Sequence, residues 1–109
     1  MKKLLALALL GFCFTANSAN IAQNICGYTS VDDKKRLRSF LKTNRLKIRR
    51  VYANIQCNGQ NPLVFADTVG ALMVGELMIS KLPKSVVEAE IPKLNNHHLI
   101  ESAQNRVED

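Results

Sequence analysis

Cysteine and histidine side chains are the residues of this sequence best suited to redox chemistry or metal binding. Cys26 and Cys57 lie far apart in the chain, whereas redox-active pairs favour the close spacing Cys-x-x-Cys. A metal ion would need further ligands, and the histidines, His97 and His98, are neighbours in a polar stretch, so their side chains point apart. The spacing therefore favours a structural disulfide between Cys26 and Cys57, with a redox-active or metal-binding pair as the alternative.

Hydroxyl and carboxyl side chains form no recognisable catalytic set. Ser30 is interpreted as a helix cap rather than a nucleophile, because no histidine lies near it in the sequence. Glu88 and Glu90 lie two residues apart in a polar stretch that suggests no cleft for acid–base catalysis. The few glycines form no phosphate-binding loop. The sequence predicts no catalytic residue, no metal site and no cofactor; a small enzyme is the less favoured alternative.

Positive charge is concentrated in one part of the chain, the basic stretch 34–50, which contains no acidic residue. Residues 20–58 carry a net charge of +7, whereas residues 59–109 carry −3. Anions would relieve the repulsion between like charges packed so densely. The candidate anion-binding residues are Lys34, Lys35, Arg36, Arg38, Lys42, Arg45, Lys47, Arg49 and Arg50.

Three interpretations of the basic stretch remain open. It can be a solvated face, which is the usual role of a charge run, or it can be covered by the acidic C-terminal half. It can also bind a polyanion such as anionic envelope lipid, lipopolysaccharide phosphates or an acidic protein. Nucleic acid is not expected, because stacking aromatic residues are sparse and the chain carries an export signal.

The export signal is the tripartite N-terminal segment 1–19. Lys2 and Lys3 precede an apolar run from residue 4 to 14, and small residues then allow cleavage after Ser18 or Ala19. The apolar run is too short to span a bilayer, and the bulky Phe12 before Cys13 argues against lipidation. The sequence thus predicts a periplasmic or secreted protein of one small domain, with no transmembrane segment after cleavage.

The first half of this domain shows a helical pattern followed by an extended one. Ser30 and Asp33 predict a capped helix over about 31–43, whose buried stripe consists of Leu37, Phe40 and Leu41. Asn44 is predicted to end this helix in the left-handed conformation. Basic and apolar residues alternate over 45–49 as in a short strand, and residues 50–55 could form a turn of helix.

The second half is predicted from turn residues and an apolar run. Asn58 and Gly59 suit a turn with positive φ, and Pro62 suits the first position of a helix. Residues 63–82 are apolar on nearly every side and predict a buried helix, or two short antiparallel helices that turn near Gly70. We expect a mainly α, compact helical domain over 20–83 with one short extended segment, followed by a polar, partly mobile C-terminal tail over 84–109.

Residues 59–79 resemble the core of an ankyrin repeat. Pro62 and Leu63 open the first helix, Gly70 turns the chain, and an apolar second helix follows. The histidine of the usual Thr-Pro-Leu-His motif is replaced by Val64, and a stack needs about three repeats to be stable. The resemblance implies a helix–turn–helix hairpin over 61–82, not an ankyrin array.

A second resemblance covers most of the chain after the leader. Cys26 is followed closely by Tyr28, residues 32–38 read Asp-Asp-Lys-Lys-Arg-Leu-Arg, and residues 57–60 read Cys-Asn-Gly-Gln. In these features the chain resembles the domain of unknown function 3718 family of small exported gammaproteobacterial proteins. The resemblance implies export, a Cys26–Cys57 pair and a compact domain over about 24–83, but no activity.

These observations together predict a non-enzymatic exported protein that acts by interaction through the basic stretch 34–50. The alternative is a periplasmic holdase, because the apolar segment 63–82 contains Met73 and Met78. Methionine side chains adapt to varied apolar partners, although a core role for them is the simpler interpretation.

Overall fold

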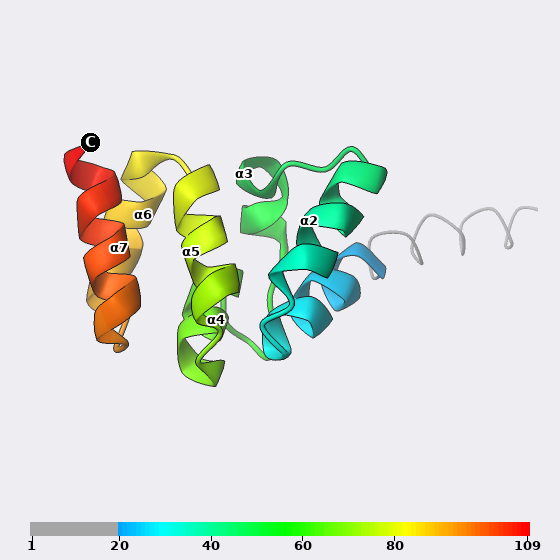
Figure 1. Ribbon diagram of the computed structural model, residues 1–109, viewed down its shortest axis with the longest axis horizontal. Helices are drawn as coiled ribbons and strands as arrows, with labels where there is room; N and C mark the ends of the chain where they lie inside the picture. The colour runs from blue at the N-terminus through cyan, green and yellow to red at the C-terminus, as the bar shows by residue number, and fades with distance from the viewer. Residues whose placement is uncertain (1–19) are drawn as a thin grey trace, which may run out of the picture.

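The computed structural model describes residues 20–109, and throughout this range the chain is built from helices and their connections (Figure 1). No strand occurs between residues 20 and 109, which confirms the mainly α prediction. The predicted leader, 1–19, lies outside the described residues. After a first helix over 20–30 the elements are α2 (Lys34–Thr43), α3 (Ile48–Val51), η1 (Tyr52–Asn54), α4 (Pro62–Val69), α5 (Leu72–Lys81), α6 (Lys84–Glu90), η2 (Ile91–Lys93) and α7 (His97–Glu108).

The first helix was not anticipated from the sequence, although its pattern is visible in retrospect. Ile21, Ile25 and Thr29 recur at intervals of four and share one face; Ile25 and Thr29 are fully buried. Thr29 satisfies its buried hydroxyl by donating to the carbonyl oxygen of Ile25, at 2.7 Å. Because this helix extends through residue 30, Ser30 cannot cap the next one, and its hydroxyl donates to Gly27 instead.

The residue that caps α2 is Asp33, so the predicted start at residue 31 was too early. Its side chain accepts a hydrogen bond from the backbone N–H of Arg36 at 3.0 Å, as an N-cap does. Asp32 turns the chain between the two helices with φ 54°. The predicted stripe is confirmed: Leu37 and Leu41 are buried, and Phe40 packs against the core.

The segment between α2 and α3 contains the short extended link, but the alternation over 45–49 does not form a strand. Arg45, not Asn44, takes the left-handed conformation, with φ 54°. Lys47 is extended, and the chain is helical from Ile48. Ile48, Tyr52 and Ile55 are all buried, and their spacing of four and three residues is helical.

The hairpin of α4 and α5 follows the pattern predicted for 61–82. Asn61 caps α4 by accepting from Val64, and Pro62 occupies the first turn. Gly70 ends α4 with φ 76°, a left-handed value that suits glycine. Helix α5 lies in the middle of the molecule, with α2 and α3 on one side and α7 on the other, which explains its apolar residues on several faces (Figure 1).

The C-terminal segment 84–109 differs most from its prediction as a polar tail. It forms α6, η2 and α7 almost to the end of the chain. Val87, Leu94, Leu99 and Ala103 are buried in the same core cluster as the α4–α5 hairpin. Helix α7 approaches α5 closely at Gly75, where a Cβ atom would lie 2.8 Å from Leu99 Cδ2. The packed helical unit therefore extends well beyond residue 83.

Candidate functional site: a basic groove

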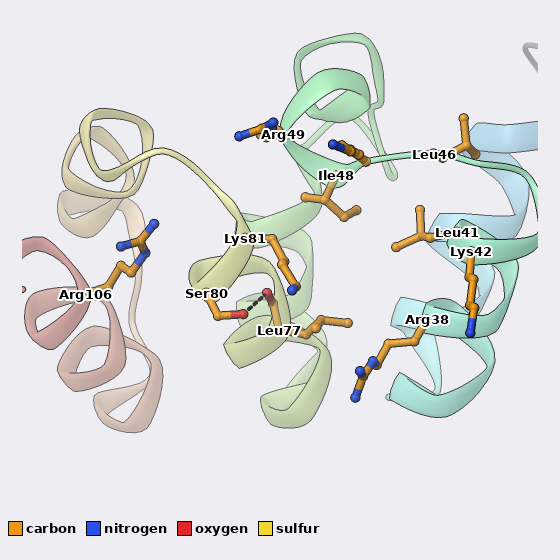
Figure 2. Close-up of a pocket in the computed structure, with 11 residues that line it drawn as sticks. Arg38, Leu41, Lys42, Leu46, Ile48, Arg49, Leu77, Ser80, Lys81 and Arg106 are labelled. Atoms are coloured by element: carbon orange, nitrogen blue, oxygen red, sulfur yellow. Dashed lines mark hydrogen bonds between the residues drawn. The ribbon is translucent and has the colours of Figure 1, made fainter.

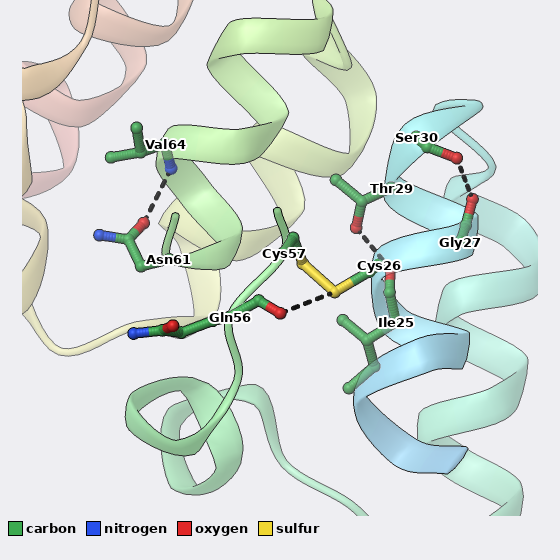
Figure 3. Close-up of a disulfide and its surroundings, with 9 residues drawn as sticks. All are labelled: Ile25, Cys26, Gly27, Thr29, Ser30, Gln56, Cys57, Asn61 and Val64. Atoms are coloured by element: carbon green, nitrogen blue, oxygen red, sulfur yellow. Dashed lines mark hydrogen bonds between the residues drawn. A yellow bond between two sulfur atoms is a disulfide. The ribbon is translucent and has the colours of Figure 1, made fainter. Parts of the chain in front are cut away.

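The two cysteines lie on different elements that the fold brings together (Figure 3). Cys26 on the first helix and Cys57 before α4 have Sγ atoms 2.10 Å apart, the distance of a disulfide bond. Cys57 is almost fully buried and begins a tight turn, in which the backbone N–H groups of Cys57 and Gln60 donate to each other's carbonyl oxygens. Asn58 and Gly59 have φ values of 55° and 78°, as predicted for this turn.

The sulfur of Cys26 also contacts the backbone of the segment that leads to Cys57. The carbonyl oxygen of Gln56 lies 3.6 Å from Cys26 Sγ; a bonded sulfur carries no proton, so this contact is not a hydrogen bond. No group of three histidine, cysteine, aspartate or glutamate residues within 20–109 is arranged to hold a metal ion. The bond ties the first helix to the segment that enters α4.

The nine predicted anion-binding residues fall into two sets. All come from α2, α3 and the link between them, and all but the half-buried Lys34 are exposed. One set lines a groove: Arg38, Lys42, Lys47 and Arg49. The other set lies outside it: Lys34, Lys35, Arg36, Arg45 and Arg50.

The groove, which we call the basic groove, has a volume of about 580 Å³ and lies between α2, α3, α5 and α7 (Figure 2). Its floor is apolar and its walls carry six cationic side chains. Leu41, Ile48 and Leu77 point from three helices toward a common space at the floor (Figure 2), and Leu46 also lines the groove. The cationic residues that line it are Arg38, Lys42, Lys47, Arg49, Lys81 and Arg106.

Lys81 and Arg106 come from the half of the chain that carries net negative charge. Lys81 lies in the last turn of α5 and Arg106 in the last turn of α7. The Arg106 guanidinium donates to the carbonyl oxygens of Ile79 (3.3 Å) and Leu82 (3.2 Å), so it also caps the C-terminal end of α5. Sequence reasoning missed both residues, because only packing places them beside the basic stretch.

Ion pairs leave this cationic surface largely unneutralised. Within residues 20–109 the only residue of the basic stretch that forms an ion pair is Arg36, which lies 3.5 Å from Asp33 on the same helix turn. The other ion pair of the described chain, Lys93–Glu90, and the His98–Glu76 contact, which is an ion pair only when His98 is protonated, lie in the C-terminal half. Among the described residues, therefore, no ion pair joins the basic stretch to the acidic half.

Glu90 belongs to a buried network on another side of the molecule. Its carboxylate accepts hydrogen bonds from Tyr52 Oη at 3.2 Å, from the Asn61 amide and from Lys93 Nζ at 3.3 Å. Burial, followed by the negative charge of Glu90 and the hydrogen bond to it, raises the pKa of Tyr52 far above its usual range. Tyr52 thus stays a neutral hydrogen-bond donor that links η1 to α4 and α6. Glu88 is exposed and takes no part in this network.

One of the two histidines, His98, contacts another helix. His98 Nε2 on α7 pairs with the Glu76 carboxylate on α5, and the backbone N–H of His98 donates to Asn96 at the start of α7. His97 is exposed.

In the part of the chain from residue 20 onward, no helix has the length and apolar character needed to cross a bilayer.

Comparison with known proteins gives a family but no characterised relative. No curated protein and no solved structure is significantly similar to the chain. The model of the family described as "Protein of unknown function (DUF3718)" matches residues 25–89. The match includes Cys26, Cys57, the whole basic stretch and the α4–α5 hairpin. The chain belongs to this family.

Proposed function

We propose that this is an exported, non-enzymatic protein that binds an anionic partner through its basic stretch 34–50. One observation carries the proposal: six cationic side chains line the basic groove, and none of its lining residues is acidic. Anionic envelope lipid, lipopolysaccharide phosphates and acidic proteins are the partner classes that such a surface fits.

The cationic side chains of the basic groove repel one another, and no acidic residue of the lining relieves this repulsion. Cationic side chains that gather without acidic neighbours raise the local positive potential, and a bound anion lowers it. A merely solvated helix face would spread its charges over a convex surface. Here Arg38 and Lys42 of α2 face Lys81 of α5 across a shared groove with an apolar floor, which favours binding over simple hydration.

Export is supported by the cysteine pair, because disulfides persist mainly in oxidising compartments. Fractionation of the native host, with mass spectrometry of the purified protein, tests this part of the proposal. We expect an N-terminus at Ala19 or Asn20 and a pair of cysteines that resists alkylation. A cytoplasmic protein that retains residues 1–18 and free thiols would refute it.

Anion binding is tested with the mature protein and heparin as a generic polyanion. We expect retention that weakens steeply as salt rises, because ionic contacts are screened over about 10 Å at 0.1 M salt. Charge reversal of Arg38 and Arg49 in the groove should weaken binding at least tenfold. The anion-binding proposal fails if heparin is not bound at low salt, or if charge reversal has no effect.

The holdase alternative receives less support from the positions of the methionines. Met78 is fully buried in the core, whereas Met73 is 54% exposed. Of the two methionines in 63–82, only Met73 is therefore available to an unfolded client. Suppression of client aggregation that disappears in Met73→Ser would favour the holdase over anion binding.

A further inference from the structure

We propose that the basic groove binds a small amphiphile, with a phosphate head group on its cationic walls and a single alkyl chain on its apolar floor. This inference rests on the proposed anion binding and specifies its ligand. It follows from three properties of the groove: its size, its floor and the disposition of its cations.

The size of the groove suits a small molecule. Ligand pockets commonly enclose about 300–1,000 Å³, and the basic groove encloses about 580 Å³. A stable protein partner would cover about 800 Å² with roughly 20–30 residues on each side. Only eleven residues line this groove, so an acidic protein would have to bind mostly outside it.

The floor of the groove calls for an apolar ligand group. Leu41, Ile48 and Leu77 retain 9%, 3% and 8% exposure, and all three line the groove. A purely hydrophilic polyanion would leave this surface in contact with water. A narrow alkyl chain laid over the three side chains would cover it, with up to about fourfold tighter binding for each methylene buried.

The walls require an anionic head group. Arg38 on α2 and Lys81 on α5 extend into the groove from opposite sides, with Lys42 beside Arg38 (Figure 2). One arginine guanidinium group can donate two parallel hydrogen bonds to two oxygens of a phosphate, and lysine ammonium groups add compact positive charges. An uncharged amphiphile would leave these groups unmatched, so charge and apolar contact together define the ligand class.

Binding is measured by titration calorimetry with dodecyl phosphate below its critical micelle concentration. Dodecyl maltoside carries the same chain without charge, and inorganic phosphate carries the charge without the chain. We expect one dodecyl phosphate per protein chain, bound at least a hundredfold more tightly than inorganic phosphate and at least tenfold more tightly than dodecyl maltoside. Equal affinity for dodecyl phosphate and either comparison compound would overturn the proposal.

Matched variants locate the site. The groove pair Arg38→Ala and Lys81→Ala removes two charges, as does the control pair Lys84→Ala and Lys93→Ala, which lies outside both the groove and the basic stretch. Ser80→Glu puts an anion into the groove, and Ser85→Glu on α6 is its control. We expect at least tenfold weaker binding from the groove variants and less than threefold from the controls.

The outcomes separate this inference from the proposed function. Heparin binding without preferential dodecyl phosphate binding would overturn the amphiphile site and leave anion binding standing. If the protein bound neither heparin nor dodecyl phosphate, both the amphiphile site and the proposed anion binding would be overturned. Equal weakening by the groove pair and the control pair, in variants whose circular dichroism and melting match the parent, would show adsorption to the overall charge and overturn the assigned site.

Discussion

Single carboxylates in this protein hold backbone amides from distant segments. Asp32 accepts from the N–H groups of Met73 (3.3 Å) and Val74 (2.8 Å), and so caps the start of α5 from another part of the chain. Asp67, which is 8% exposed, accepts from Asn95 (2.9 Å) and Asn96 (2.8 Å). A buried carboxylate is tolerated only with such partners. These acidic residues are therefore engaged with the backbone.

Replacement of Asp67 should lower the free energy of unfolding, because its carboxylate accepts two backbone hydrogen bonds. Asp67→Ala leaves the N–H groups of Asn95 and Asn96 without their acceptor just before α7, and we expect a loss of about 1–3 kcal/mol in the free energy of unfolding. Urea denaturation measures it. Glu88→Ala removes an exposed carboxylate and should change stability by less than about 0.5 kcal/mol. Equal effects of the two substitutions would contradict the assigned role.

Tyr52 gives stability an alkaline dependence. Its folded-state pKa is raised above the ordinary 10.0, so above that pH the unfolded state binds fewer protons than the folded state, and stability falls as pH rises. Below pH 10 Tyr52 is neutral in both states, and its full contribution to the free energy of unfolding is present. Tyr52→Phe, which lacks the hydroxyl, should be less stable than the parent at pH 7, and the difference should shrink above pH 10. Chemical denaturation at pH 7 to 11 tests this; a constant difference would contradict it.

At the scale of elements, α5 organises the packing because it contacts α2, α3, α4 and α7. It packs tightly against α7, where Gly75 lies directly against the fully buried Leu99. Close packing of this kind tolerates little added volume. A glycine in the middle of a helix, which would ordinarily weaken it, is here the condition for the two helices to meet.

Two glycine-to-alanine substitutions should therefore have opposite effects. Gly75→Ala forces a Cβ atom to within 2.8 Å of Leu99 Cδ2, and we expect a net loss of about 1–3 kcal/mol in stability. Gly27→Ala in the first helix meets no atom within 4 Å and should gain about 0.4–1 kcal/mol, because alanine restricts the unfolded chain. Thermal melts of both variants test this. Stabilisation by Gly75→Ala would refute the proposed close contact.

Local signals made several elements predictable, and their lack explains the errors. Asn58, Gly59, Pro62 and Gly70 each have a backbone preference that the structure satisfies, so the turn and the α4–α5 hairpin follow directly. Helix α7 was harder, because its buried positions include the small Ala103 and it is held through contacts with α5 and α6. A polar sequence without strong periodicity does not reveal that a distant helix will cover it.

At the scale of the whole molecule, packing assembles a charge distribution that the sequence order conceals. The predicted basic stretch supplies four of the six cationic residues of the basic groove. Lys81 and Arg106 supply the others from a half whose net charge is −3. The sequence reveals only the basic residues that are neighbours along the chain. It could not separate Arg49, which lines the groove, from Arg50, which does not, since this depends on how α3 packs against α5.

The disulfide determines how the first helix is attached to the rest of the molecule. It closes a loop with a sequence separation of 31 residues, and the loss of chain entropy in the unfolded state then contributes about 3–4 kcal/mol. We expect the double variant Cys26→Ser and Cys57→Ser to lose an amount of this order in urea denaturation. Relative to the parent, amide hydrogen exchange should accelerate more in residues 20–30 than in α5, because the first helix loses its covalent link. Dithiothreitol should reproduce the loss in the parent and leave the double variant unchanged; a parent indifferent to reduction would show that packing alone retains this helix.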